Sequence, residues 1–435
     1  MTDILWYIGG VAFIALGIGF SIGLHELGHL YPAKKFHVKV PHYAIGFGPT
    51  LFKFTRGETT YALKLIPLGG YITMLGMYPP EKAGAKPRTG FFGRMITSAR
   101  EAHSEFETPA DANRKFYQLP VLKRMVIMFG GPFMNLVLGT ALLAIVFSGI
   151  GVNQPSTLVQ QVSACVPATP TEVCNDASPA SPALAAGIKA GDRILSINGS
   201  AANDLYAQIQ ALPANKSVAV EVHRAGATVT LNVVPTSALR QVIDESTGAI
   251  KVDANGEPVL EARTVFGIVF GNERVAQPIG TAFEQAGLNV SQVAVMITTL
   301  PNQLADAASA TFGGGERNPN GAISVVGIGQ IAGTVAAADQ VDLVDKLSTG
   351  LLILASLNFA LFTFNMIPLL PLDGGHIAGG VYESIKRGIF RLRGKKDPGP
   401  ADTALLTPAT WLVFMVLLGM SALLILADLI NPIAL

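Results

Sequence analysis

The sequence predicts a polytopic α-helical membrane protein with four transmembrane helices and a small β-rich domain between the second and third of them. Half of its 435 side chains are hydrophobic and only 14% are charged, a balance that is rare in a soluble enzyme of this size. The mean hydropathy of +0.43 agrees with this class. A formal net charge of +1 argues against a nucleic-acid partner, because a phosphate-binding surface needs an excess of basic side chains.

Four apolar stretches are long enough to cross the hydrocarbon core of a bilayer, which takes about 20 helical residues. They are residues 4–24, 125–152, 347–372 and 403–427. The first stretch has no Lys or Arg before it and no small-residue cleavage site after it, so we interpret it as a true span and not as a signal peptide.

Basic residues close to the span ends predict the orientation. They cluster in the loops between spans one and two and between spans three and four, whereas the segment between spans two and three has one, Lys346, beside a membrane end. We therefore expect a multi-pass protein of the cell inner (plasma) membrane. Residues 31–124 and 377–402 would be cytoplasmic, and residues 153–346 and both termini would be extracytoplasmic.

The extracytoplasmic segment changes character along its length. Residues 155–236 contain short β-rich runs separated by Gly, Asn and Pro turns, which predicts a small β-rich domain. Residues 278–311 have apolar side chains at helical spacing, which predicts either a helix along the membrane surface or an amphipathic helix packed on its own domain. Cys165 and Cys174 form a possible disulfide in this oxidising compartment; two free thiols are the alternative.

The motif His25-Glu26-Leu27-Gly28-His29 continues directly from the first span. On a helix, His25 and His29 lie on one face and can share a metal ion, while Glu26 can reach a water beside it. Three ionisable residues at the end of an otherwise uncharged span are costly in hydrocarbon and indicate a functional site. The alternative is a pair of histidines that only cap the span at the interface.

A catalytic zinc site also needs a third protein ligand. Asp373, in the segment NMIPLLPLDGG, is the acidic residue at the end of the third span, on the same side of the membrane as the two histidines. Pro368 and Pro371 prevent a regular helix there, and irregular backbone at membrane depth is tolerated only inside protein or around a cavity. A helix stop with a capping aspartate is the alternative. Zinc and a carboxylate base together support hydrolysis of a peptide bond.

These segments together carry a family resemblance. HELGH on the first span, GGPFMN at residues 130–135, NMIPLLPLDGG on the third span and a PDZ-like segment outside resemble the site-2 protease family of intramembrane zinc metalloproteases, specifically the bacterial regulator of sigma-E protease (RseP) type. The resemblance covers nearly the whole chain. It implies regulated intramembrane proteolysis of a single-span membrane protein of the anti-sigma factor class, whose outer part has already been trimmed.

The resemblance also implies roles for individual residues. The zinc (Zn²⁺) ligands would be His25, His29 and Asp373, the catalytic base would be Glu26, and Asn365 would help to hold the substrate. Asn135, in the second span, could hydrogen-bond across to the active site or serve only in helix packing.

Two further parts of the chain are similar to family elements. The β-type runs on either side of residues 55–58 resemble a membrane re-entrant β-hairpin with a GFG element, here Gly46-Phe47-Gly48, which would hold an extended substrate by β-addition. A plain cytoplasmic β-ribbon is the alternative. Residues 181–199 resemble part of a bacterial PDZ domain, which could bind a peptide C-terminus or act as a spacer. Only one such segment is visible, whereas the RseP type commonly carries two in tandem.

The predicted segments follow in chain order: transmembrane helix 1 with HExxH (1–30), a cytoplasmic loop (31–124) with the re-entrant hairpin (about 40–76) and a polar, flexible insertion (about 79–111), transmembrane helix 2 (125–152), a PDZ domain (153–240), a C-terminal PDZ region with an amphipathic helix (241–346), transmembrane helix 3 with the LDGG motif (347–376), a cytoplasmic loop (377–402) and transmembrane helix 4 (403–427). The alternative function is a membrane-anchored PDZ adaptor with a non-catalytic metal site. A transporter is disfavoured because no internal repeat is visible.

Overall fold

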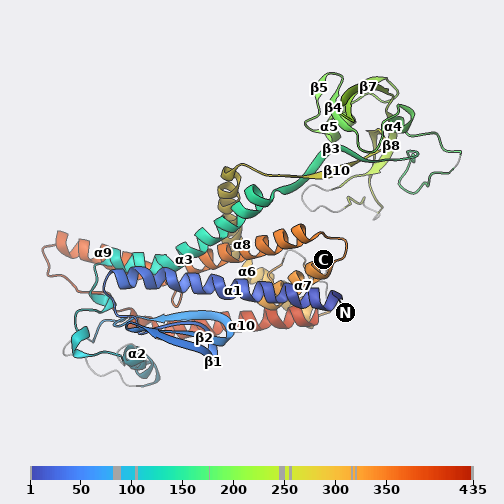
Figure 1. Cartoon of the computed structure of the whole chain (residues 1–435). Helices are drawn as coiled ribbons and strands as arrows, with labels where there is room; N and C mark the ends of the chain where they lie inside the picture. Colours follow the sequence, from blue (N-terminus) through green and yellow to red (C-terminus); the bar gives the residue numbers. More distant parts are fainter. Residues whose placement is uncertain are drawn as a thin grey trace. The chain divides into compact units, whose positions relative to one another are not determined.

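The chain folds into two compact units in a computed structural model that describes residues 2–81, 90–102, 106–175, 177–243, 250–253, 257–314, 317–318 and 321–432 (Figure 1). The first unit comprises Met1–Ile150 and Ala276–Leu435 and is mainly helical. The second comprises Gly151–Val275 and is rich in β-strands.

The helical unit is organised around long apolar helices. Its helices are α1 (Thr2–Lys35), α2 (Gly90–Ala102), α3 (Val121–Ala144) with a π-helical turn (Ile145–Ile150), α6 (Ile279–Phe312), α7 (Val325–Ala337), α8 (Leu343–Asn365), α9 (Asp373–Leu392) and α10 (Thr407–Ile430). Short 3-10 turns occupy Pro109–Asp111, Phe116–Gln118 and Thr403–Leu406. In the described part of the chain four helices, α1, α3, α8 and α10, are long and apolar enough to cross a membrane.

Glycines allow the long helices to approach one another closely. A methyl group added to Gly28 of α1 would collide with the carbonyl oxygen of Gly130 in α3, and one added to Gly130 would collide with that of Gly28. Gly139 lies in the same way against the ring of Phe359 in α8. Close backbone approach of this kind stabilises helix pairs in hydrocarbon, where burying a leucine brings little gain.

The helix α6 belongs to the helical unit. Its buried residues Ala282 and Ala286 share an apolar cluster with Leu143 of α3 and Phe359 of α8. The region 241–346, predicted to be one extracytoplasmic region, is therefore divided between the two units at Val275. The helix α6 joins the helical unit because its alanines pack against α3 and α8. The spacing of apolar residues shows that a helix has an apolar face, but it does not show which partner that face packs against.

A long hairpin leaves α1 and returns to it. Its strands are β1 (His42–Arg56) and β2 (Thr59–Thr73), and their register is irregular, since Ala44 pairs with both Ala62 and Tyr71. The insertion predicted at about 79–111 contains α2; its residues 82–89 and 103–105 lie outside the described part.

The β-rich unit has a five-strand path with the order β10-β3-β4-β6-β7, and β5 pairs with β4. Its strands are β3 (Val152–Val162), β4 (Arg193–Ile197), β5 (Ser200–Ala201), β6 (Val218–Arg224), β7 (Ala227–Val233), β8 (Thr236–Gln241), β9 (Leu260–Val265) and β10 (Ile268–Val275), with short helices α4 (Pro182–Ala185) and α5 (Leu205–Gln210). Alternate residues of β6, Val218, Val220 and Val222, point into the core.

The strand β10 extends this unit beyond its predicted end at residue 240. It pairs with β3 at the edge of the sheet, with Val275 opposite Val152. This pairing joins segments more than a hundred residues apart, so it depends on the tertiary structure and cannot be predicted from local sequence patterns. In the same unit Cys165 and Cys174 are joined in a disulfide, with their Cα atoms 6.0 Å apart.

Candidate metal centre

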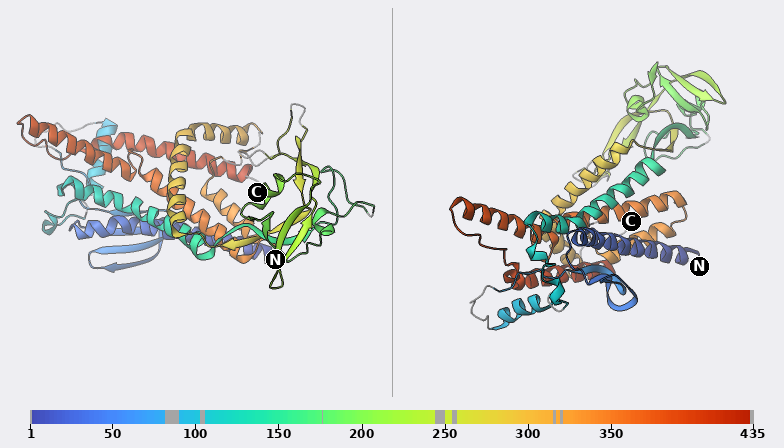
Figure 2. Two further views of the ribbon diagram at one scale, coloured as in Figure 1. Left: turned by 90° about the horizontal axis from the view of Figure 1, so that it is seen from above. Right: turned by 60° about the vertical axis from the view of Figure 1, so that its left-hand side comes forward.

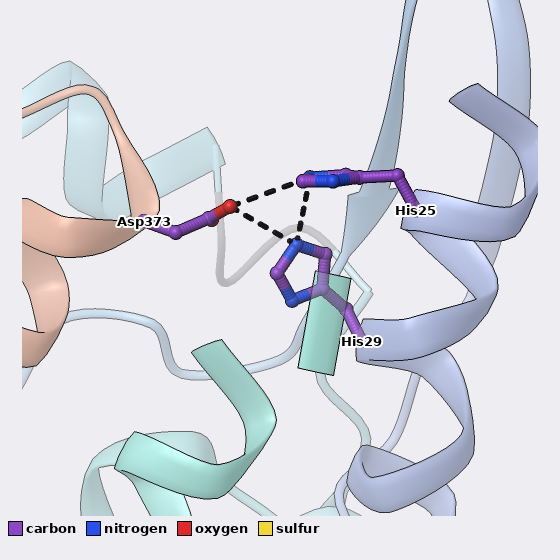
Figure 3. A group of neighbouring side chains, drawn as sticks. All are labelled: His25, His29 and Asp373. Atoms are coloured by element: carbon purple, nitrogen blue, oxygen red, sulfur yellow. Dashed lines mark hydrogen bonds and ion pairs between the residues drawn. The ribbon is translucent and has the colours of Figure 1, made fainter. Parts of the chain in front are cut away.

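Three side chains converge beside the C-terminal third of α1 (Figure 3). His25 and His29 stand one turn apart on α1, and Asp373 is the first residue of α9. The Nε2 atoms of the two histidines are 3.2 Å apart, and the Asp373 Oδ2 atom lies 3.3 Å from that of His25 and 3.4 Å from that of His29. Figure 3 shows the carboxylate pointing at both rings.

The far side of each imidazole ring has an oxygen partner. Nδ1 of His25 lies 2.6 Å from Oδ1 of Asn135, and Nδ1 of His29 lies 2.8 Å from the carbonyl oxygen of Ile127, both on α3. Because a carbonyl oxygen only accepts, each Nδ1 donates, and each Nε2 presents its lone pair to the centre. Histidine ligands of metals are held in this way in general.

These three donors fit a zinc ion. The Asp373 Oδ2 atom is buried and has no hydrogen-bond donor among the described residues. Around a tetrahedral zinc with bonds of about 2.0–2.1 Å, neighbouring ligand atoms are about 3.3–3.4 Å apart, which matches the observed spacing. In the described part of the chain, His25, His29 and Asp373 form the one group of this kind that could hold a metal ion.

A buried relay of hydrogen bonds supports His25. The Asn135 amide donates to Oδ1 of Asn358 at 2.9 Å, the Asn358 amide donates to Oγ of Ser21 at 2.9 Å, and the Ser21 hydroxyl donates to the carbonyl oxygen of Gly17 at 2.8 Å. The Asn358 amide also donates to the Leu354 carbonyl oxygen at 2.8 Å, which can only accept, so Oδ1 of Asn358 faces the Asn135 amide and Oδ1 of Asn135 faces His25.

The sequence interpretation did not include Asn358 or Ser21. Both are buried polar residues inside apolar spans, and a polar residue at such a position is itself a signal of function. Ser21 also precedes His25 by one helical turn. These two signals could have found the relay.

Glycine makes room for the histidines. A methyl group on Gly131 of α3 would collide with Nε2 of His29 and would lie 2.8 Å from Nε2 of His25. On the opposite side, methyl groups on Gly374 and Gly375 would meet backbone atoms of the loop that precedes α9. Glycine therefore lets the α3 backbone approach the two imidazole rings, and lets the start of α9 pack closely against the loop that precedes it.

Glu26 lies buried beside the centre, on the side of the hairpin. A methyl group on Gly70 of β2 would lie 3.0 Å from Cγ of Glu26. The hydroxyl of Tyr43 in β1 donates to the carbonyl oxygen of Gly23 at 2.7 Å, and this bond holds the base of the hairpin against α1. The hairpin is thus attached next to the carboxylate.

The other predicted residues lie further along these elements. Asn365 is the last residue of α8 and is half-buried, and among the described residues no hydrogen bond joins it to the centre. The segment Gly46–Gly48 lies in β1, where Gly46 and Gly48 have φ angles of +88° and +83° that favour glycine. The Phe47 ring covers Gly69 of β2.

Apolar helices and a buried two-histidine, one-carboxylate donor set with an adjacent glutamate define a membrane metallopeptidase. The sequence model of peptidase family M50 matches residues 13–397. The chain therefore belongs to peptidase family M50, the site-2 proteases, and is an intramembrane zinc protease with Zn²⁺ as its cofactor.

The sequence aligns with curated relatives over most of the chain. The zinc metalloprotease Rip1 of Mycobacterium tuberculosis (strain H37Rv) is 30% identical over 441 residues, which cover 99% of this chain and 100% of the relative. Rip1 of Mycolicibacterium smegmatis is 32% identical, with 98% of each chain covered, and the metalloprotease MmpA of Caulobacter vibrioides is 29% identical, with 85% of each covered. Membership of a peptidase family favours the enzyme over the adaptor.

Proposed function

We propose that the protein is an intramembrane endopeptidase that cuts a single-span membrane protein close to the cytoplasmic face, after the outer part of that substrate has been trimmed. The observation that carries this proposal is the convergence of His25, His29 and Asp373 within 3.4 Å, with Glu26 buried beside them. An anti-sigma factor is the class of substrate that we infer from the resemblance to the RseP type.

In the proposed mechanism His25, His29 and Asp373 hold the zinc ion. When bound, zinc polarises the carbonyl of the scissile bond and increases the acidity of water. Glu26 accepts the proton of the attacking water and passes it to the leaving amine. Asn135 and the Ile127 carbonyl keep both histidines in the tautomer that presents Nε2.

The hairpin β1–β2 is proposed to be re-entrant and to present the substrate. Large apolar side chains are exposed along it, among them Leu51, Phe52 and Leu65, and such a surface suits contact with hydrocarbon better than contact with water. A transmembrane substrate must unwind before it is cut, and its freed backbone groups need new partners. A strand near Glu26, with Gly46–Gly48 and Asn365 as further contacts, would supply them.

The β-rich unit is proposed to be a PDZ domain that binds an extended peptide. β10 lies at the edge of the sheet, so its outer side can pair with an added strand. A cavity of about 390 Å³ lies between α5, through Tyr206 and Ile209, and the residues around the start of β10, through Phe266 and Phe270. Arg240 and Arg263 also line this cavity and suit a peptide carboxylate.

The first experiment measures cleavage of a tagged single-span substrate by the purified full-length protein. We expect the wild type to cut and Glu26→Gln to be inactive, and a zinc chelator to stop the wild type. Equal cutting by both proteins would remove Glu26 from the mechanism.

A second experiment tests the ligand set by metal content. Asp373→Ala is expected to lose zinc, whereas Asp339→Ala, a change of the same kind at an exposed residue, is expected to keep it. Unchanged zinc in Asp373→Ala would overturn the ligand assignment.

A third experiment compares the cleavage of substrates with and without their extracytoplasmic domain. Faster cutting of the shortened form supports trimming, and equal rates contradict it.

A further inference from the structure

The helix α9 has an exposed apolar face that no described part of the chain covers. Val381, Tyr382, Ile385, Ile389 and Leu392 follow one another at helical spacing, and their exposed fractions run from 42% for Ile389 to 89% for Leu392. The opposite face of α9 is buried through Gly380 and Glu383. A helix with one face on the protein and an apolar face turned outward is suited to contact with lipid.

Basic residues border the apolar face at Lys386, lie on the side of Glu383 at Arg387 and Arg391, and continue past the end of the helix. They are Lys386, Arg387, Arg391, Arg393, Lys395 and Lys396. Arg387 has acidic partners in Glu383 and Asp397, but within the described residues Arg391, Lys395 and Lys396 are exposed and form no ion pair. Several basic residues directly beside a span are suited to binding anionic lipid headgroups.

The position of α9 in the helical unit agrees with a headgroup contact. α9 extends beyond the end of α1 in Figure 1 and in the left view of Figure 2. A methyl group on Gly380 would meet Val121 at the start of α3, so the part of α9 that carries the apolar face begins beside the end of that span. An apolar cavity of about 810 Å³ beside Tyr382 and Lys386, lined also by Leu405 and Val413, adds room for an acyl chain.

An ion pair joins α9 to α3, the helix that also supports the two histidines. The first residue of α9 is Asp373, and its buried Glu383 accepts from Arg124 of α3 at 2.6 Å and from the backbone N–H of Ala401 at 2.9 Å. Because Asp373 belongs to this helix, a shift of α9 along or about its axis would move the carboxylate relative to the two histidines.

We propose that α9 is a docking surface for anionic phospholipid of the cytoplasmic leaflet, and that this lipid holds Asp373 in its place at the metal centre. The apolar face of α9 lies against acyl chains, and Arg391, Lys395 and Lys396 bind headgroup phosphates. The effect on cleavage rests on the proposed function; the lipid binding does not.

The test uses the purified full-length protein in nanodiscs made of phosphatidylcholine alone or with about one-third phosphatidylglycerol. The variant is Arg391→Gln/Lys395→Gln/Lys396→Gln. The matched control is Lys189→Gln/Lys216→Gln/Lys251→Gln, which removes the same charge from exposed positions of the β-rich unit. Association of spin-labelled phosphatidylglycerol with the protein, zinc retained during a chelator challenge, and substrate cleavage are measured for each protein.

We expect the wild type and the control to prefer phosphatidylglycerol, and the α9 variant to lose up to about 100-fold of this preference, at about 5-fold for each basic residue. Zinc retention and cleavage should rise with phosphatidylglycerol in the wild type and not in the α9 variant. Free glycerol phosphate added to phosphatidylcholine discs should not replace the lipid.

Two results would overturn the proposal. One is an α9 variant with the lipid preference of the wild type, and the other is zinc retention that does not depend on lipid. If the wild type binds phosphatidylglycerol and keeps zinc but cuts nothing, the proposed function fails and the lipid site stands. If glycerol phosphate substitutes, the site binds a soluble anion and not the membrane.

Discussion

The two units distribute polar and apolar side chains in opposite ways. In the helical unit Asn135 and Asn358 are fully buried, while Leu412 of α10 is 67% exposed. In the β-rich unit Val220 and Val222 are fully buried, and their neighbour Glu221 lies on the other face of the strand and bonds Ser196. The first pattern suits hydrocarbon as the surrounding solvent and the second suits water.

The difference teaches what stabilises each unit. In water, burying an aliphatic side chain is worth about 1.5–3 kcal/mol. In hydrocarbon that gain is missing, and helices are held by close backbone contact and by polar links between helices. Changes to glycine and asparagine should therefore damage the helical unit, and changes to core aliphatic residues should damage the β-rich unit.

Among changes outside the proposed zinc ligands and base, the largest expected effect is that of Gly131→Ala. Its methyl group would collide with the His29 ring, and displacing a ligand by an ångström costs on the order of 100-fold in rate. We expect bound zinc to be lost and cleavage to fall to about 1% or less. Gly149→Ala is the control, because a methyl group there meets nothing within 4 Å. Normal zinc content in Gly131→Ala would show that the backbone can shift to make room.

A change in the core of the β-rich unit should strongly reduce the stability of that unit but should leave the zinc content unchanged. Ile194→Ala is expected to cost about 2–5 kcal/mol of stability, measured as protease susceptibility of residues 151–275 in the full chain. Its neighbour Leu195 is exposed, so Leu195→Ala should change little. Equal susceptibility of the two variants would contradict the assignment of this core.

A polar change in the helical unit should have a moderate effect. Asn358→Leu removes the acceptor of Asn135 and the donor to Ser21, and loss of such a support costs about 10- to 100-fold in metal affinity or activity. Thr363→Val on the same helix is the control, since its hydroxyl bonds only within the helix, to Phe359. Zinc titration of both variants distinguishes them. Wild-type affinity in Asn358→Leu would mean that His25 needs no relay.

The smallest expected effect is the loss of stability at low pH. Each unit contains a carboxylate whose pKa is lowered by a basic partner, so both units should lose stability as the pH falls. A hydrogen bond from Lys39 lowers the pKa of Asp111 to about 2, and one from Arg224 lowers the pKa of Asp192. Because each folded-state pKa lies below the unfolded value, each carboxylate stabilises the protein above about pH 4 and loses this effect as pH falls through its folded-state pKa, which for Asp111 is about 2. Melting curves should show the advantage of wild type over Asp111→Asn shrinking through that range. A constant advantage would exclude this ion pair as its source.

Much of the chain could be predicted because local patterns carried the information. A span needs only length and apolar composition, and the spacing of His25 and His29 places both on one face of any helix. Asp373 followed from being an acidic residue at a matching membrane depth. The extent of the β-rich unit did not follow, since β10 joins it by pairing with β3. Nor did Asn358, whose role depends on which helices meet.

The sequence by itself predicted which segments are apolar enough to span a membrane, the peptidase family and the residues proposed as zinc ligands, because composition and short-range periodicity are properties of the chain alone. The tertiary structure decided how those residues act together. It brings Asn135 and Ile127 to the histidines, opens space for them at Gly131, and places the Asp373 carboxylate against both rings. These contacts join positions about a hundred or more residues apart, and only packing of the helices can bring such positions within a hydrogen bond of one another.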